Sequence, residues 1–287
     1  MKVVVVSPAV PHPFGETAAR GLYALVTGLL DRGIRVSCLV VTEEQAARVR
    51  DARVRLATSP GADHLELAVF PPTVRPVALR KLRSLRRPFS ETLHGDGLAA
   101  ALGRQAAAGW DVLHLDQLWS GWVGLDRRRV LLNVYQLEVI DWEARRGLRL
   151  AERKALVQMR RATGRIVRGS RHIRVVSRRL LERARAINPT AEYSCVPFAL
   201  DASLYPLQPL VREPVVGLLG SMHWLPSRSA AERLITRIWP RVKRRLPHAR
   251  LLVGGWNARR YLDRYAGSDI RLVEQLVTIG PGRLRST

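Results

Sequence analysis

Cysteine is nearly absent, with only Cys38 and Cys195 among 287 residues. Both lie in apolar runs, and their spacing fits neither a disulfide framework nor a zinc motif, so we expect two buried thiols in a reducing compartment. Long hydrophobic runs are absent too, because no stretch of eighteen apolar residues occurs. The valine run at the N-terminus is too short for the core of a signal peptide, so we expect a cytoplasmic protein without a membrane span.

Lysine and acidic residues are also scarce. Of 48 basic residues only four are lysines, against 24 acidic residues, so the formal net charge of +24 is carried almost entirely by arginine. Codon composition is one interpretation of this excess, and a partner with phosphates or an anionic surface is the other, since positive charge concentrates anions. Aromatic residues make up 6% and none lies among the arginine runs, so we expect no nucleic-acid partner.

What the chain does contain is an alternation of short apolar runs and helical patterns. Residues 3–6 are typical of a strand buried on both faces, 17–32 predict an amphipathic helix, and 34–41 predict a second strand. The alternation continues and predicts an α/β fold with a doubly wound parallel sheet. Further strands are predicted at 65–70, 112–115, 130–134, 173–176 and 193–196, and further helices at 97–108, 149–168 and 178–186.

The same pattern starts again at residue 215. Residues 204–214 hold three prolines without periodicity, and we interpret them as a linker. Beyond it a strand is predicted at 215–219, a loop at 220–227, a helix at 229–246 and a strand at 251–253. We therefore expect a complete Rossmann-like domain at 1–203 and the first part of a second one at 215–287.

Two loops follow the first strands of these domains and open helices. Backbone amides at such helix starts can hold an anion. The loop at 7–15 matches no phosphate motif, so an ordinary turn is an equal alternative. In the loop at 220–224, Gly220 lets a phosphate approach the backbone, Ser221 can donate a hydrogen bond, and His223 or Arg228 can add charge. Trp224 is interpreted either as packing or as a stacking surface for a base.

Several acidic or titratable residues follow predicted strands. Glu138 lies near the end of the strand at 130–134, while Asp141 and Glu143 suit the start of a helix. His114 and Asp116 lie at the end of another strand, where a structural role is the favoured interpretation for the histidine. No metal-binding spacing and no serine-hydrolase elbow occurs in the sequence.

Two basic stretches, Arg80–Arg87 and Arg145–Arg168, interleave cations with apolar residues. Such helices can lie on anionic lipid headgroups. The alternative is a solvated face whose arginine stems cover apolar surface.

Residues 215–227 read Val-Val-Gly-Leu-Leu-Gly-Ser-Met-His-Trp-Leu-Pro-Ser, and 246–256 read Leu-Pro-His-Ala-Arg-Leu-Leu-Val-Gly-Gly-Trp. This stretch resembles the start of the donor domain in family 4 retaining glycosyltransferases of the GT-B fold, in the branch with a Gly-Ser-Met-x-Trp-x-Pro loop. The Val-Pro-Phe-Ala-Leu-Asp run at 196–201 is similar to the crossover of that family. The resemblance covers nearly the whole chain and is loose in the first domain.

The resemblance implies a GT-B-like fold and transfer of a sugar from a UDP- or GDP-linked donor, without metal or cofactor. The acceptor would be a glycan or lipid-linked molecule of polysaccharide or cell-envelope biosynthesis, reached at the inner face of the cell membrane. The expected donor site consists of Gly220, Ser221, Met222, His223, Arg228 and Gly255. The expected facing loop consists of Phe14, Gly15, Glu16 and Arg20.

The chain departs from the family at three points. It lacks the Glu-x7-Glu motif, it has few basic residues after the donor loop, and Tyr135 stands where many members have histidine. Tyr135 and the nearby Glu138 are therefore the candidate catalytic residues. We expect a truncated glycosyltransferase with impaired activity. The alternative is a non-catalytic module of the same fold that binds anionic lipid or glycan.

Overall fold

The computed structural model describes residues 1–43, 46–73, 88, 95, 97–124, 129–143, 147–200, 202–204 and 214–274. The chain divides into two compact units, Met1–Asp201 and Ala202–Thr287. The basic stretch Arg80–Arg87 lies outside the described residues, as do residues 205–213 of the expected linker and the tail beyond residue 274.

Within its described residues, the first unit is built on seven parallel strands in the order β3-β2-β1-β4-β5-β6-β7. Valine runs fill the centre of this sheet, where Val3 pairs in register with Val36 on one side and Val112 on the other. The strand order reverses between β1 and β4, which is the position where open parallel sheets bind ligands beyond their carboxyl ends. The strands are β1 (Lys2–Ser7), β2 (Arg35–Val41), β3 (Leu65–Phe70), β4 (Val112–Asp116), β5 (Val130–Val134), β6 (His172–Val175) and β7 (Glu192–Cys195).

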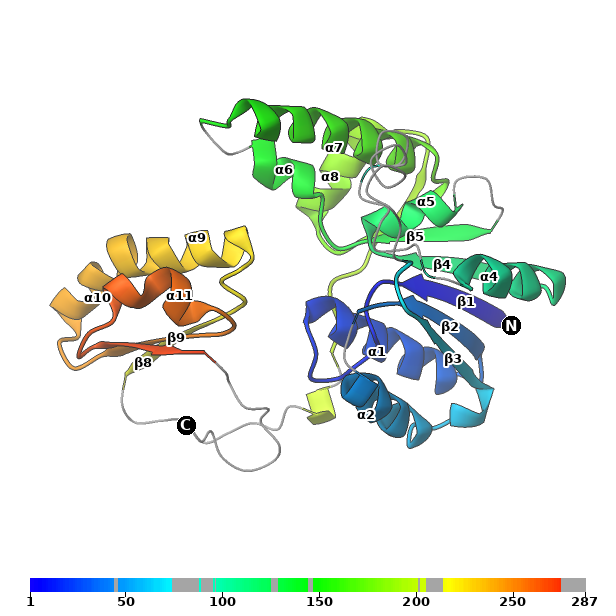
Figure 1. Ribbon diagram of the computed structural model, residues 1–287, viewed down its shortest axis with the longest axis horizontal. Helices are drawn as coiled ribbons and strands as arrows, with labels where there is room; N and C mark the ends of the chain where they lie inside the picture. Colours follow the sequence, from blue (N-terminus) through cyan, green and yellow to red (C-terminus); the bar gives the residue numbers. More distant parts are fainter. Residues whose placement is uncertain are drawn as a thin grey trace. The chain divides into compact units, whose positions relative to one another are not determined.

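Helices cover both faces of this sheet (Figure 1). Residues of α4, α5, α7 and α8 form one hydrophobic core with alternate residues of the central strands. Helices α1 and α2 lie on the opposite face, as right-handed crossovers in a sheet with this strand order require. The helices are α1 (Thr17–Leu30), α2 (Ala46–Ala57), α4 (Leu98–Ala107), α5 (Gly121–Gly124), α6 (Glu138–Glu143), α7 (Leu150–Arg168) and α8 (Arg178–Ile187).

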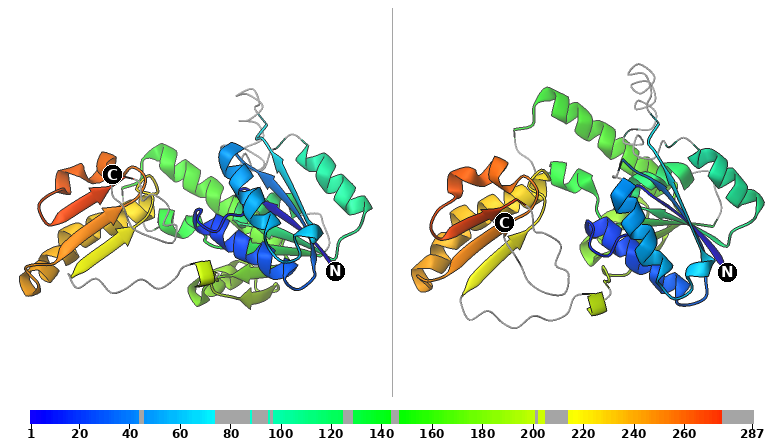
Figure 2. Two further views of the ribbon diagram at one scale, coloured as in Figure 1. Left: turned by 90° about the horizontal axis from the view of Figure 1, so that it is seen from below. Right: turned by 60° about the horizontal axis from the view of Figure 1, so that its bottom comes forward.

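The described part of the second unit has three parallel strands in the order β10-β9-β8, drawn from yellow to red in Figure 2. These are β8 (Val215–Leu219), β9 (Arg250–Gly254) and β10 (Ile270–Val273). The helices are α9 (Leu225–Arg233), α10 (Trp239–Arg245) and α11 (Ala258–Leu262), and a π-helical segment at Leu234–Ile238 joins α9 to α10. Their apolar residues share one core with Leu251, Val253 and Leu272. This unit therefore repeats the strand–helix–strand opening of the first.

Two expectations about local structure need correction, and two elements were not predicted. The helix expected to begin at residue 229 begins at Leu225, because Pro226 lies in the first turn, where a proline costs no hydrogen bond. Cys38 is buried as expected, and burial raises the pKa of its thiol to about 12. Cys195 is exposed, since it ends the edge strand β7. The basic helix α2 and the strand β10 have no counterpart in the sequence-based prediction.

No helix in the described residues is both long enough and apolar enough to cross a lipid bilayer.

Candidate functional site

Polar side chains gather on the α1 face of the central strands. In β4, β5 and β6, alternate residues such as Leu115, Leu132 and Ile173 pack in the core on the other face. Because side chains alternate along a strand, their neighbours must point toward the α1 face. A parallel sheet is normally apolar on both faces, so a polar set at this position is informative. It consists of His114, Asp116, Asn133 and Arg174.

Asp116 is the centre of a buried hydrogen-bond network. Ser7 Oγ donates to one carboxylate oxygen at 2.9 Å, and Asn133 Nδ2 donates to the other at 3.0 Å. The Tyr135 hydroxyl is a further hydrogen-bonding neighbour of Asp116. Arg174 Nη1 donates to Asn133 Oδ1 at 3.2 Å, so Asn133 links the carboxylate to the guanidinium. The network fixes the positions of Tyr135 and Arg174.

Burial dominates the protonation of this cluster. It raises the pKa of Asp116, although hydrogen bonds from Tyr135, Asn133 and Ser7 favour the carboxylate. Burial, with the charge of Asp116 as the second cause, also raises the pKa of the Tyr135 hydroxyl. Tyr135 therefore keeps its proton at neutral pH and can act as a hydrogen-bond donor.

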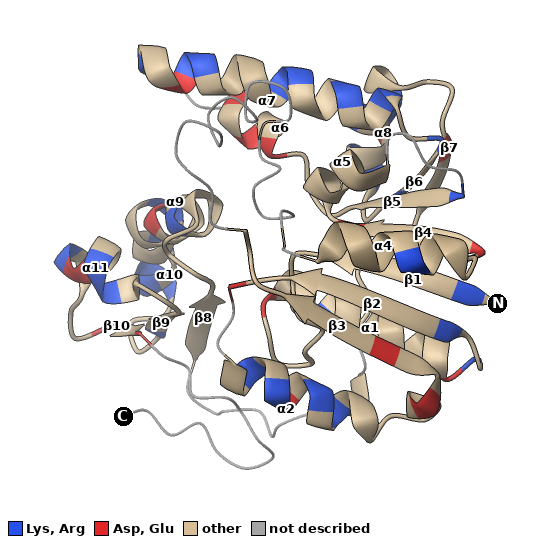
Figure 3. Ribbon diagram, turned by 45° about the vertical axis from the view of Figure 1, so that its right-hand side comes forward, with Lys and Arg blue, Asp and Glu red and all other residues tan. Residues whose placement is uncertain are grey.

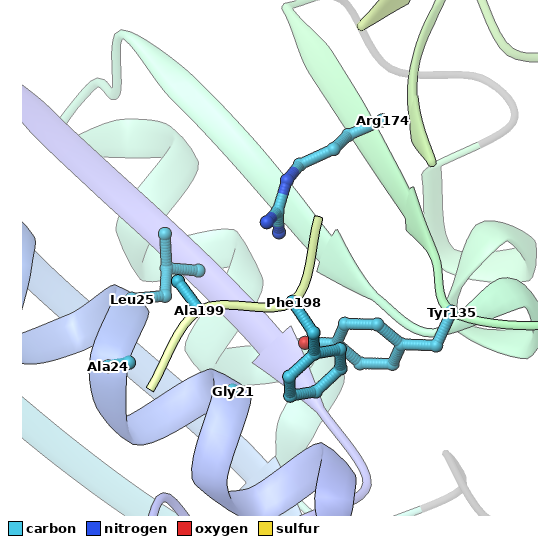
Figure 4. Close-up of a pocket in the computed structure, with 7 residues that line it drawn as sticks. All are labelled: Gly21, Ala24, Leu25, Tyr135, Arg174, Phe198 and Ala199. Carbon is cyan, nitrogen blue, oxygen red and sulfur yellow. The ribbon is translucent and has the colours of Figure 1, made fainter. Parts of the chain in front are cut away.

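A pocket of about 170 Å³ opens beside this cluster (Figure 4). The rings of Tyr135 and Phe198 lie 5.0 Å apart between centroids and are tilted by 47°. A Cβ atom at position 21 would lie 2.5 Å from the Phe198 ring, so only glycine lets α1 and this ring approach so closely. The pocket therefore combines apolar walls with one hydroxyl and one guanidinium. Its lining residues are Gly21, Ala24, Leu25, Tyr135, Arg174, Phe198 and Ala199.

The structure separates the two expected catalytic residues. Tyr135 lines the pocket, whereas Glu138 begins α6 and accepts a hydrogen bond from Trp119 Nε1 at 3.2 Å. Glu143 ends α6 and pairs with Arg160 at 2.8 Å. In the part of the chain that the structure describes, no group of three or more His, Cys, Asp or Glu side chains could hold a metal ion.

The loop after β1 is a turn with its own hydrogen bonds. His12 Nδ1 accepts from the amide of Phe14 at 3.1 Å, so Nε2 carries the proton and donates to Asp51 at 2.6 Å. Arg20 Nε donates to the carbonyl of Gly15 at 2.6 Å, so this hydrogen bond holds the Arg20 side chain against the loop. Glu16, which the sequence also predicts for this loop, is exposed and lies at the N-cap position of α1.

The loop after β8 is closed against the loop after β9. The amide of Gly220 donates to Gly254, and the amide of Met222 donates to Trp256. The side chain of Met222 is fully buried in the core of the second unit, so it cannot contact a ligand. At Gly255 the backbone has φ 138°, and a Cβ atom there would lie 2.0 Å from the carbonyl oxygen of Gly220.

The side chains around this loop remain accessible. Ser221 is half-buried, and His223 is exposed with its ring 6.0 Å from that of Trp256. Arg228 lies 4.4 Å above the Tyr261 ring. Trp224, which precedes α9, is 49% exposed, so the interpretation of this residue as core packing is wrong.

Sequence reasoning missed Asn133, Arg174, Gly21 and Phe198 as members of the pocket and its network. A signal for two of them was present, because Asn133 and Arg174 interrupt otherwise apolar strand runs. A polar residue at a buried strand position needs partners, and that requirement identifies a cluster. No local pattern marks Gly21 or Phe198.

No family model and no curated protein matches the sequence. Solved structures match through the fold. The apo form of the lipopolysaccharide outer core galactosyltransferase WaaB is 11% identical with a TM-score of 0.52, over 96% of this chain and 68% of that chain. UGT71G1 from Medicago truncatula, complexed with UDP-glucose, is 12% identical with a TM-score of 0.52, over 95% of this chain and 71% of that chain. At such identities the likeness concerns the fold, and it confirms the predicted α/β, GT-B-like architecture.

Proposed function

We propose that this chain is a GT-B glycosyltransferase of the family 4 type that transfers a sugar from a nucleotide-sugar donor. The observation that carries the proposal is the likeness, over 95% of the chain, to an enzyme solved with UDP-glucose. The resemblance of residues 215–256 to a donor domain supports the same assignment. The proposed acceptor is a glycan or lipid-linked molecule of polysaccharide or cell-envelope biosynthesis.

The second unit is the proposed donor-binding unit. Its loop places Gly220 and Ser221 directly after β8, on the side of the sheet where α9 begins, and the dipole of that helix favours a diphosphate there. Gly255 holds the neighbouring loop against Gly220, which keeps the first loop in one conformation. Arg228, on the first turn of α9 beyond the loop, adds a positive charge.

The first unit is the proposed acceptor-binding unit, through the pocket of Tyr135 and Arg174. In the transfer, an acceptor hydroxyl forms a bond to the anomeric carbon and the bond from that carbon to the diphosphate breaks. The departing diphosphate takes the electron pair, and the hydroxyl proton leaves to a phosphate oxygen or to water. Hydrogen-bond donors directed at the negative charge that develops on the leaving diphosphate then lower the free-energy barrier of the transfer. The Tyr135 hydroxyl, whose proton is directed to Asp116, accepts a hydrogen bond from the acceptor and so orients it.

Donor binding is tested by calorimetry of UDP and GDP with the full chain. We expect Arg228→Gln to weaken binding about tenfold, because a charge-assisted hydrogen bond to phosphate is worth roughly 1.4 kcal/mol. The control is Arg233→Gln, an exposed arginine in the last turn of the same helix, which should leave the affinity unchanged. If the unaltered chain binds neither nucleotide and releases no sugar from a UDP- or GDP-sugar, the proposed function is wrong.

A specific observation also favours contact with an anionic membrane surface. Helix α7 exposes a stripe at helical spacing, formed by Leu150, Lys154, Val157, Arg161 and Arg168 and here called the α7 stripe. Leu150 is 84% exposed and Val157 is 44% exposed. Basic residues lie along the whole helix in Figure 3. Cations interleaved with exposed apolar side chains suit a lipid headgroup layer.

Charge reversal of Lys154, Arg161 and Arg168 to glutamate is expected to weaken binding to phosphatidylglycerol vesicles about a hundredfold or more, since each cation contributes roughly 1 kcal/mol near such a surface. Co-sedimentation measures this loss, with phosphatidylcholine vesicles as the neutral reference. The matched control reverses three exposed arginines of α8, Arg178, Arg179 and Arg183. An equal loss in both variants would reflect net charge alone and would remove the α7 stripe from the proposal.

A further inference from the structure

We infer that the pocket of the first unit selects an acceptor that carries an anionic oxygen group, a carboxylate or a phosphate, and that Arg174 is the residue that reads it. The inference rests on the proposed function, because it names the substrate class of the proposed acceptor site. It does not depend on donor binding, since the pocket and its network lie wholly within residues 1–201.

The charge of Arg174 is the first argument. Its guanidinium donates to Asn133 at 3.2 Å, and within the described residues no carboxylate forms an ion pair with it. A guanidinium has five N–H donors, so most of its hydrogen-bonding capacity remains for a ligand. By contrast, Arg55, Arg160 and Arg264 each have a carboxylate within 3.1 Å.

Asp116 does not neutralise this cation by direct contact. Its two carboxylate oxygens accept from Ser7 and Asn133, and Asn133 lies between the carboxylate and Arg174. The network therefore holds the guanidinium in place while leaving it open toward the pocket. Figure 4 shows the end of the Arg174 side chain directed toward Phe198 and Ala199.

The walls around Arg174 are the second argument. Gly21, Ala24 and Leu25 supply an apolar wall from α1, and Phe198 faces them from the segment after β7. A half-buried cation among apolar walls attracts an anion more strongly than an exposed one, because less water screens the charge. The same walls fit the flat face of a sugar or aromatic ring. The pocket thus suits a ring that bears one acidic group.

Selectivity follows from the cost of unpaired groups. The carboxylate or phosphate of an acidic acceptor pairs with Arg174 through two parallel hydrogen bonds, the geometry that a guanidinium matches best. A neutral analogue of the same shape would displace water from the guanidinium without replacing its hydrogen bonds. The pocket therefore discriminates against neutral acceptors as well as favouring acidic ones. The Tyr135 hydroxyl then serves a second polar group of the ring.

The test uses the full chain without nucleotide and three probes that share the same sugar ring: glucose 6-phosphate, glucuronate and glucose. Ligand-observed NMR titration should give at least tenfold tighter binding for one or both acidic sugars than for glucose. Preference for the phosphate assigns a phosphorylated acceptor, and preference for the carboxylate assigns an acidic sugar. Equal binding of all three probes would overturn the inference.

Arg174→Met should remove the preference for the acidic probes. The matched control is Arg171→Met, whose side chain is 80% exposed just before the same strand and which should keep the preference. Arg174→Lys retains the charge without the planar fork and should keep part of the preference, which covers the case in which the methionine variant fails to fold. An acidic preference that survives in a folded Arg174→Met protein would contradict the inference. Failure of UDP and GDP to bind would overturn the proposed function alone.

Discussion

Replacing Gly255 by alanine is expected to destabilise the second unit by about 3 kcal/mol or more, since backbone strain and steric overlap each cost roughly 1–3 kcal/mol. The backbone at Gly255 has φ 138°, which side chains of L residues rarely adopt. The new Cβ atom would also lie 2.0 Å from the carbonyl oxygen of Gly220, which is part of the backbone and cannot rotate away.

The consequence of this substitution reaches the proposed donor loop. Gly255 donates its amide to Val273 and accepts from Ala258, so it joins the carboxyl ends of β9 and β10 to the start of α11. Pushing it away from Gly220 separates the two loops at that edge of the sheet. Chemical unfolding measures the loss of stability, and calorimetry with UDP or GDP is expected to show loss of binding in the same variant.

Gly267→Ala is the matched control for Gly255→Ala. A Cβ atom at position 267 would meet only Asp269 Oδ1, at 3.9 Å, which is ordinary contact. The control should change the free energy of unfolding by about 0.5 kcal/mol at most, as is usual for unstrained sites. Equal destabilisation by both substitutions would show that the close approach at Gly255 carries no special cost.

The second large effect is a loss of stability in mild acid through His114. This imidazole is buried on β4 and its Nε2 has no hydrogen-bond partner in the described part of the chain. Burial, with the charge of Arg174 as a lesser cause, lowers the pKa of His114 from 6.5 to about 4. The unfolded chain therefore binds a proton between these two pH values that the folded chain does not bind.

Proton linkage gives the direction in which the folding stability changes with pH. Stability attributable to neutral His114 is fully present above pH 6.5 and is lost as pH falls toward about 4. The loss amounts to about 3 kcal/mol, because each pKa unit corresponds to roughly 1.4 kcal/mol. The raised pKa of Asp116 acts in the opposite direction, since it favours the folded state as pH falls. The difference between the unaltered protein and a His114 variant isolates the histidine.

Urea unfolding from pH 7 to pH 4 measures this difference. His114→Gln removes the titrating group and should flatten the fall in stability by about 3 kcal/mol over that range. His172→Gln is the control, since this histidine lies on β6 with 41% of its side chain exposed and pairs with Glu192. Parallel pH profiles for the unaltered protein and His114→Gln would rule out His114 as the origin of acid sensitivity.

Local pattern predicted the elements of both units well where apolar residues were regular. Strands at 65–70, 130–134 and 215–219 have the bounds that the structure gives. Helix α2 was missed because its cations and few apolar residues leave little periodicity to detect. Met222 was assigned to the donor loop by its motif, and its side chain is in the core. A motif identifies the chain segment, whereas packing decides which way each side chain points.

The pocket illustrates what local pattern could not supply. Tyr135 and Glu138 are three residues apart, yet the turn into α6 separates their side chains. Tyr135 lines the pocket, whereas Glu138 accepts a hydrogen bond from Trp119. Phe198 lies in the segment that follows β7, the edge strand of the sheet. This segment returns to α1, where the Phe198 ring lies against Gly21 and so lines the pocket. The positions of these side chains depend on the order of the strands in the sheet, which the periodicity of a single helix or strand cannot predict.

The sequence by itself determined the class of fold, the duplicated strand–helix opening and the basic character of α7, because apolar spacing and charge are local properties of the chain. Only the tertiary structure decided the site. Ser7 and Asp116 are 109 residues apart, and Arg174 is 41 residues from Asn133, yet they form one buried network. They meet because β1, β4, β5 and β6 lie side by side with their carboxyl ends at one edge. Buried polar groups need hydrogen-bond partners, and Asp116 and Asn133 find theirs in this network. The same network holds Arg174 through Asn133 with its guanidinium facing the pocket.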